Sequence, residues 1–102
     1  MTTKQTEEAT VLLTHEGGLH ARPAVKFTQL ASQFESSVRF RPDQASDWIN
    51  AKSIVKVSRA KVRKDTLLHI QAQGDDAEAA VQALIGLVER SFDEAKGGSA
   101  DA

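Results

Sequence analysis

A histidine and an arginine lie close together in the segment Gly17–Ala24, which reads GGLHARPA. His20 follows two glycines and precedes residues with a helical pattern, and Arg22 comes two positions later. Backbone N–H groups at the start of a helix have no partner within the helix, and together with the helix dipole they attract anions. Arginine adds a fixed cationic fork, and a neutral imidazole is a nucleophile near pH 7. The segment therefore predicts a histidine that is presented to a phosphoryl group.

Other kinds of catalytic or metal site have little support. His15 and His69 are the remaining histidines, and neither lies at a His-x-x-x-His or Glu-x-x-His spacing, so we expect no metal site and no cofactor. The absence of cysteine excludes disulfides and thiolate metal sites. No nucleophile–base pair or obvious pair of catalytic carboxylates is visible, which ranks a hydrolytic or metal-dependent enzyme last among the alternatives.

Two further features leave their interpretation open. A run of basic residues is either a solvated face or part of a partner-docking surface near His20. Trp48, the only tryptophan, is either an anchor at a strand edge or a contact residue. The basic run consists of Lys52, Lys56, Arg59, Lys61, Arg63 and Lys64.

Length and composition indicate one ordinary globular domain. The chain has 102 residues, of which 40% are hydrophobic and 26% charged. A formal net charge of −1 gives no field that would recruit nucleic acid or an anionic membrane. The apolar runs are too short to span a bilayer, and the polar segment Met1–Glu8 lacks the apolar core of a secretory signal. We therefore expect a cytoplasmic protein with neither nucleic-acid nor membrane partners.

The elements around His20 follow from hydrophobic periodicity. Alternation predicts a strand over Ala9–Leu13, and the loop Thr14–Leu19 leads from it to a helix that starts at about Ala21. Pro23 is compatible with the first turn of that helix. The apolar seam of the helix is predicted to contain Ala24, Phe27, Ala31 and Phe34, with Leu30 beside it.

The second half of the chain predicts three more strands and a closing helix. The strands lie at 37–41, at Trp48–Ile49 and from Leu67 to an end at Gly74, whereas Ala51–Ala60 fits either a strand or a short helix. Asp75 and Glu78 resemble a capping box at the start of the closing helix, which is expected to end near residues 91–92. Its predicted buried residues are Ala77, Ala80, Val81, Leu84, Leu87 and Val88. This order favours an α+β fold with the helices on one face of a sheet.

The segment Gly18–Ala24 resembles the active-site signature of HPr, the histidine-containing phosphocarrier of the bacterial phosphoenolpyruvate-dependent phosphotransferase system. The resemblance continues through 26–31, 50–54 and the closing helix, and covers about residues 6 to 92. It implies an HPr-like domain over 6–92, between a flexible N-terminus at 1–5 and a flexible tail or linker at 93–102. The implied fold is an open-faced β-sandwich, βαββαβα, with a four-stranded antiparallel sheet, helices on one face and a short helix from about Ser53.

The resemblance also implies a function. His20 would accept a phosphoryl group at ring Nδ1 from phosphorylated enzyme I and pass it to IIA-type domains, with Arg22 orienting the group. Ser53 falls on the position that a dedicated HPr kinase phosphorylates in some bacteria, although its hydroxyl could simply cap a helix. The expected protein is a monomeric phosphoryl-transfer intermediate rather than an independent catalyst.

The chain departs from the common family pattern after Ser53. Family members often continue Ile-Met-Gly, whereas this chain has Ile54-Val55-Lys56, with Ser58 and Arg59 close by. A more basic surface is expected to change partner choice and salt dependence. The alternative function is a regulatory binding module, acting in the nitrogen-related branch or through Ser53. A free-standing carrier and a domain fused to enzyme I both remain open.

Overall fold

The computed structural model describes residues 5–43, 45 and 47–93. Its helices and strands follow the order βαββαβα that the resemblance implied, and the ambiguous segment forms a short helix. The elements are β1 (Thr6–Leu13), α1 (Arg22–Ala31), β2 (Ser37–Pro42), β3 (Ile49–Asn50), α2 (Ile54–Ala60), β4 (Thr66–Gln73), α3 (Ala77–Glu89) and a final 3₁₀ turn, η1 (Ser91–Asp93). Apart from Gln5 and Asp93, the terminal segments expected to be flexible lie outside the described residues.

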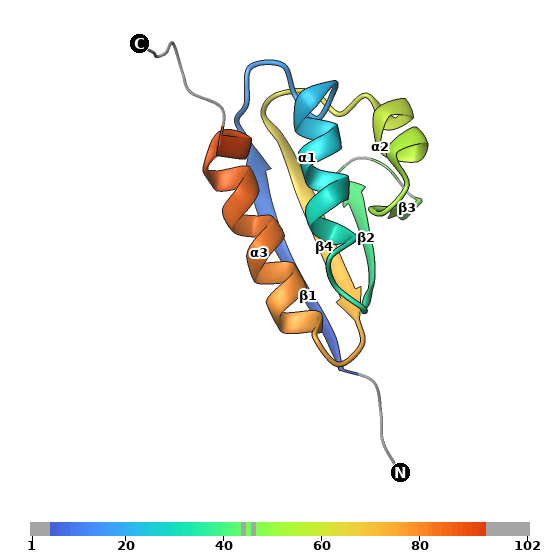
Figure 1. Ribbon diagram of the computed structural model, residues 1–102. Helices are drawn as coiled ribbons and strands as arrows, with labels where there is room; N and C mark the ends of the chain where they lie inside the picture. Colours follow the sequence, from blue (N-terminus) through green and yellow to red (C-terminus); the bar gives the residue numbers. More distant parts are fainter. Residues whose placement is uncertain (1–4, 44, 46, 94–102) are drawn as a thin grey trace.

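The four strands form one antiparallel sheet in the order β1-β4-β2-β3. Helices α1 and α3 lie side by side across one face of it, and α2 lies near β3 at the edge (Figure 1). Alternation along the strands sends Val11 and Leu13 of β1, and Leu68 and Ile70 of β4, into the core. The predicted open-faced α+β sandwich is therefore confirmed.

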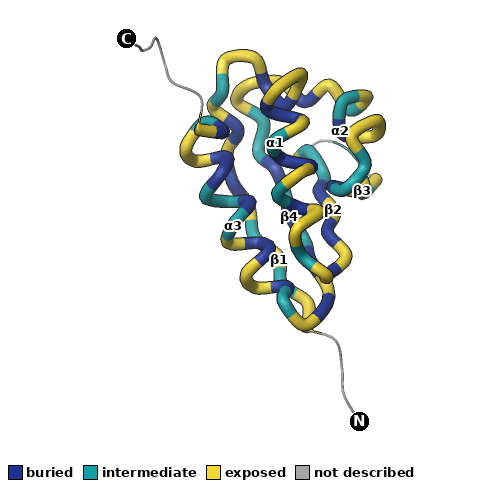
Figure 2. The backbone as a smooth tube through the Cα atoms, viewed as in Figure 1, coloured by how far each residue is buried: buried dark blue, intermediate teal, exposed yellow. Residues whose placement is uncertain are grey.

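Burial follows the helix faces that the spacing predicts, as Figure 2 shows. In α1 the buried side chains include Ala24, Phe27 and Ala31, and the Phe27 ring meets the Phe40 ring edge-on with centroids 5.3 Å apart. Burying a large apolar side chain contributes about 1.5–3 kcal/mol, so this seam fixes the helix on the sheet. The buried residues of α3 are the six predicted ones, Ala77, Ala80, Val81, Leu84, Leu87 and Val88. Within the described ranges, no helix has the length and hydropathy needed to cross a bilayer.

The predicted extents of one helix and one strand are wrong by a few residues. Helix α1 ends at Ala31, so Phe34 lies beyond it in a tightening turn in which its N–H donates to the Ala31 carbonyl at 3.3 Å. Phe34 still packs against the core from that turn. Strand β3 comprises Ile49–Asn50, and Trp48 precedes it, because pairing with β2 begins only at Ile49 opposite Phe40.

The predicted capping box of α3 is also wrong. The N-cap is Asp76, one residue later than Asp75, and its side chain makes no cap hydrogen bond. Its carboxylate instead accepts the N–H groups of Glu35 and Ser36, both at 2.9 Å, and the hydroxyl of Ser36. The carboxylate is thus used to bind the loop before β2. Gly74 permits this approach, since a Cβ there would lie 2.5 Å from the Ser36 Oγ.

Helix α3 ends at Glu89, before the predicted end at Ser91 or Phe92. Ser91, Phe92 and Asp93 all have positive φ, at 52°, 59° and 60°, so the chain leaves the right-handed helix in a left-handed turn. The turn directs the Phe92 side chain into the core, where it is fully buried. Burial of this ring offsets the cost of a backbone conformation that side chains other than glycine rarely adopt.

Candidate functional site

The loop between β1 and α1 is pinned to the segment that follows α2. The N–H of Leu19 donates to the Val62 carbonyl at 2.9 Å, and the two residues form an isolated antiparallel bridge. Leu19 is fully buried, and the N–H of Gly18 closes the loop by donating to the His15 carbonyl at 2.9 Å. This attachment therefore fixes the backbone immediately before His20.

Gly18 is required for this pinning. Its φ is +70°, a left-handed value, and a Cβ at this position would collide with the Val62 carbonyl oxygen. Glycine is the residue that allows two backbones to approach so closely. The close approach of the loop to Val62 therefore explains why residue 18 is a glycine.

His20 is exposed and lies just outside the start of α1. Between them, Ala21 is the N-cap and has φ 53° and ψ −125°, an unusual conformation for a residue with a Cβ. Such strain costs about 1–3 kcal/mol and is typical of functional sites. The first helical residue is Arg22, also exposed, so the structure brings the predicted imidazole and guanidinium to the same helix end.

The start of α1 has donors for an anion. Ala21 supplies no side-chain cap, Pro23 has no N–H, and the first bond of the helix runs from the Val25 N–H to the Ala21 carbonyl at 3.1 Å. The remaining N–H groups of the first turn and the positive end of the helix dipole lie at the helix end that His20 precedes. No acidic residue lies in this turn, so nothing there opposes a phosphoryl group.

His20 borders an open hollow of about 620 Å³ with a basic rim. Lys64 donates to Glu16 across the rim at 3.0 Å, and the hydrogen bond and charge of Glu16 raise the pKa of Lys64. The lining comprises Glu16, Gly17, His20, Lys61, Val62, Arg63 and Lys64. The basic run of the sequence therefore reaches the neighbourhood of His20 through its last three members.

The C-terminal turn contacts both α1 and the loop before it. The sequence did not indicate these contacts. Lys26 of α1 donates to the Phe92 carbonyl at 2.8 Å, and the buried Phe92 ring meets the His15 ring edge-on at 5.6 Å. His15 Nδ1 accepts the N–H of Gly17 at 3.0 Å. Helix, loop and C-terminal turn are thus linked around the start of α1. No spacing rule could have found Phe92, because its left-handed turn has no periodicity.

Ser53 caps α2. Its Oγ accepts the N–H of Lys56 at 3.3 Å, so the capping role weighed for this residue is confirmed. Lys52 donates to the Phe34 carbonyl at 2.7 Å and ties the start of α2 to the loop after α1. The basic run thus divides into three parts. Lys52 makes a structural contact, two members lie on α2, and three line the hollow beside His20; the α2 members are Lys56 and Arg59, and the last three are Lys61, Arg63 and Lys64.

Large apolar side chains are exposed on the two helices next to the site. Val25 of α1 is 40% exposed, and Ile54 and Val55 of α2 are 39% and 58% exposed. Helices α1 and α2 contact each other. Large apolar side chains exposed on neighbouring helices are typical of a protein-docking surface.

The remaining histidines lie in other settings. His69 on β4 pairs with the Asp43 carboxylate at 2.9 Å, whereas His15 contacts the C-terminal turn. In the part of the chain that the structure describes, no group of three or more His, Cys, Asp or Glu residues could hold a metal ion.

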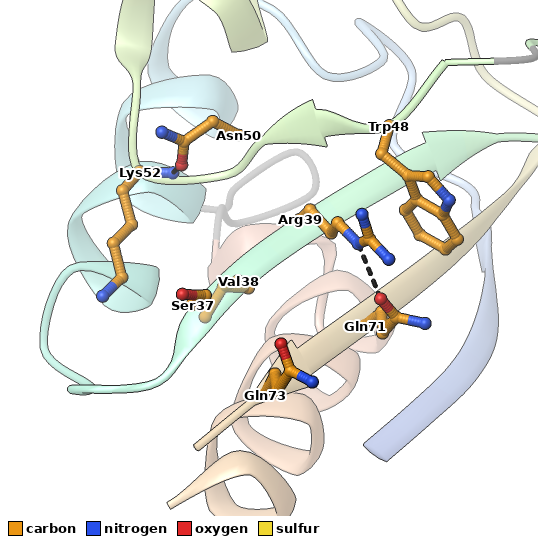
Figure 3. Close-up of a pocket in the computed structure, with 8 residues that line it drawn as sticks. All are labelled: Ser37, Val38, Arg39, Trp48, Asn50, Lys52, Gln71 and Gln73. Carbon is orange, nitrogen blue, oxygen red and sulfur yellow. Dashed lines mark hydrogen bonds between the residues drawn. The ribbon is translucent and has the colours of Figure 1, made fainter. Parts of the chain in front are cut away.

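A second hollow, of about 440 Å³, lies on the helix-free face of the sheet (Figure 3). Arg39 places its guanidinium 4.6 Å from the centre of the Trp48 ring and donates to Gln71 at 2.6 Å. Arg41 lies 5.4 Å from the same ring. Trp48 is therefore held by cation–π contacts at the sheet edge, as the anchor interpretation requires, and it also lines the open hollow.

A family model described as "PTS HPr component phosphorylation site" matches residues 7–90. The chain belongs to the HPr family. It is 42% identical over 77 residues to phosphocarrier protein HPr of Haloferax volcanii, covering 76% of this chain and 86% of that protein. It is 34% identical over 94 residues to phosphocarrier protein NPr of Escherichia coli K12, covering 92% and 99%.

Solved structures agree with this assignment. HPr-C-His from Thermoanaerobacter tengcongensis superposes with a TM-score of 0.81 at 38% identity, over 88% of this chain and 99% of that one. As an HPr-family member, the chain is a phosphotransfer carrier of the phosphotransferase system. His20, Arg22 and Ser53 all lie inside the matched range.

Proposed function

We propose that this HPr-family chain accepts a phosphoryl group from phosphorylated enzyme I on His20 Nδ1 and passes it to IIA-type domains of the sugar phosphotransferase system. One observation carries the proposal. An exposed imidazole lies two residues before Arg22, the first residue of a helix whose N-cap, Ala21, makes no side-chain hydrogen bond. Residues 6–92 act as the carrier domain, as a monomer in the cytoplasm and without a cofactor.

The transfer step follows from this arrangement. The lone pair of His20 Nδ1 forms a bond to phosphorus while the bond between phosphorus and the donor breaks, and the donor keeps that electron pair. The phosphoryl oxygens then accept hydrogen bonds from the N–H groups at the start of α1 and from the Arg22 guanidinium. Transfer to a IIA-type domain is the same exchange with this chain as donor. The step needs no further reactant.

Partner docking would use the exposed side chains beside His20. Val25, Ile54 and Val55 supply apolar area, and Lys56 and Arg59 on α2 are exposed cations. Such a patch favours partners with an apolar centre and acidic residues around it. The apolar area is small, which suits the short-lived contacts that a carrier must make with several partners.

The decisive test is phosphorylation with phosphoenolpyruvate and enzyme I. The unmodified chain should acquire an acid-labile, base-stable label, and His20→Ala should acquire none, whereas His69→Ala serves as a histidine control that labels normally. Arg22→Gln should slow labelling by about 10- to 100-fold, the usual effect of losing a charged hydrogen bond. Undiminished label in His20→Ala overturns the proposal.

The nitrogen-related branch is the alternative, because the NPr relative matches nearly its whole length to this chain. Mixing the phosphorylated chain with a sugar-specific IIA domain and with its nitrogen-branch counterpart tests the branch. We expect faster transfer to the sugar-specific domain, and preference for the other assigns the nitrogen branch. Regulation at Ser53 would need an HPr kinase, and failure of such a kinase to label Ser53 excludes that route.

A further inference from the structure

The hollow beside His20 has an excess of positive charge that Arg22 does not explain. Its lining contains three cations, Lys61, Arg63 and Lys64, and one acid, Glu16. The Glu16 carboxylate is held by Lys64 at 3.0 Å, so the one acid of the lining is paired. The lining therefore carries more positive than negative charge, and Lys61 and Arg63, both exposed, contribute to that excess.

The backbone between these two cations is attached to the loop that carries His20. Val62 is 5% exposed, and its carbonyl accepts the N–H of Leu19, the residue before His20. Lys61 and Arg63 flank that bridge on either side. The attachment that positions His20 therefore also positions the two cations.

Lys61 occupies a backbone conformation that favours glycine. It is the C-cap of α2, with φ 51° and ψ 49°, and its N–H donates to the Ser58 carbonyl at 3.3 Å. Helices commonly end in this left-handed conformation with glycine, because a Cβ is strained there. A lysine at such a position keeps a charge beside His20 at the expense of local stability, which points to a use for the charge.

We propose that Lys61 and Arg63 form a second phosphoryl-binding pair that stabilises the phosphorylated form of His20. The inference rests on the proposed function, because it needs a phosphoryl group at His20. The ligand is the dianionic phosphoryl group itself, held between the start of α1 on one side and these two cations on the other. The pair thereby tunes how readily the chain keeps or releases its phosphoryl group.

The expected effect of each cation is modest because both are exposed to solvent. Ion pairs at a protein surface change an equilibrium by between about 1.5- and 5-fold. The effect should shrink as salt is added, since exposed charges are screened. A transfer equilibrium measures the effect directly and does not depend on how fast partners dock.

The test mixes the phosphorylated wild-type chain with an equal amount of an unphosphorylated variant and a trace of enzyme I. Mass spectrometry at equilibrium then gives the share of phosphoryl group on each. Lys61→Asn, which suits the left-handed conformation without charge, and Arg63→Gln should each hold about 1.5- to 5-fold less than the wild type. Lys61→Arg should restore an equal share, and Arg39→Gln, which removes an exposed cation on the helix-free face of the sheet, is the matched control.

Lys61→Gly separates charge from conformation. It should melt at a higher temperature than the wild type, because glycine fits the C-cap, yet it should hold less of the phosphoryl group. Equal sharing by Lys61→Asn and Arg63→Gln overturns the inference while leaving the proposed function intact. Failure of the wild-type chain to accept the phosphoryl group at all overturns the proposed function instead.

Discussion

Gly18, Leu19 and Ala21 determine where the imidazole of His20 lies. Gly18 lets the loop touch the backbone at Val62, Leu19 buries its side chain, and Ala21 turns the chain sharply into α1. The position of His20 and Arg22 at the start of a helix could be predicted from the sequence, because the signals for a helix start lie in neighbouring residues. The contact with Val62 could not, because it joins segments that lie far apart in the chain.

Replacing Gly18 by alanine should destabilise the protein and slow phosphorylation together. The new Cβ would collide with the Val62 carbonyl, and the positive φ adds strain, at a combined cost of about 1–3 kcal/mol. Denaturant unfolding measures the first effect, and the rate of labelling by enzyme I measures the second.

Gly17→Ala is the matched control for that prediction. A Cβ at Gly17 would meet only the His15 ring, at 3.6 Å, an ordinary contact distance. Its free energy of unfolding should therefore stay within about 0.5 kcal/mol of the wild type. Equal destabilisation by the two alanines would show that the approach to Val62 does not matter.

Whole elements are joined at two places by single residues that contact other elements. The Asp76 carboxylate at the start of α3 binds the loop before β2, and the left-handed turn after α3 brings Phe92 against His15 in the loop between β1 and α1. Periodicity predicted which faces of α1 and α3 are buried. Periodicity did not predict the contacts of Asp76 and Phe92, since each depends on a single residue whose partners lie in other elements.

Stability should depend on pH through Asp76. The Ser36 hydroxyl first, and then the Glu35 N–H, hold the pKa of Asp76 below its ordinary value of 3.8. A carboxylate with a lowered folded-state pKa contributes stability that is present above 3.8 and is lost as pH falls through the lower folded value. Acid titration followed by circular dichroism should show this loss below about pH 4.

Asp76→Asn tests the assignment of that pH dependence. The variant should be less stable at neutral pH, and its stability should change less on acidification through the same window. A wild-type acid profile that the variant reproduces unchanged would place the sensitive carboxylate elsewhere. Ser36→Ala, which removes the largest cause of the pKa shift, should move the profile toward higher pH.

Ser91→Gly should stabilise the C-terminal turn. Ser91 follows the C-cap Arg90 with φ 52°, the position at which helices prefer glycine. Relief of that strain is expected to contribute about 1 kcal/mol, or a melting temperature higher by about 4–8 °C for a domain of this size. Differential scanning calorimetry measures it, and Ser32→Gly, at a right-handed C-cap, should give no such gain.

At the scale of the whole molecule, a nearly neutral protein carries a basic region. The net charge is −1, yet cations follow one another along α2 and the segment after it. These residues are Lys56, Arg59, Lys61, Arg63 and Lys64. Composition alone predicted no directing field, and the fold produces a local one because it places Lys61, Arg63 and Lys64 around the hollow that His20 borders.

Phosphoryl uptake should therefore be sensitive to salt. Raising ionic strength from about 0.1 M to about 1 M shortens the Debye length from about 10 Å to about 3 Å, which should slow association with enzyme I. Stopped-flow kinetics of the Lys56→Glu variant should show slower uptake and a weaker salt dependence. Glu78→Lys, an exposed charge change on α3, should behave like the wild type, and an identical loss in both variants would argue against local steering.

The cation–π contacts at the sheet edge have a practical consequence for spectroscopy. Trp48 is the only tryptophan and the chain has no tyrosine, so its emission reports on a single place, the packing of Arg39 and Arg41 against the indole. That place lies on the helix-free face of the sheet, where Figure 3 shows Trp48 beside Arg39. Fluorescence should therefore follow unfolding of the β2–β3 edge while remaining constant during phosphorylation. Trp48 is therefore an intrinsic optical probe of folding that should not respond to phosphorylation of the chain.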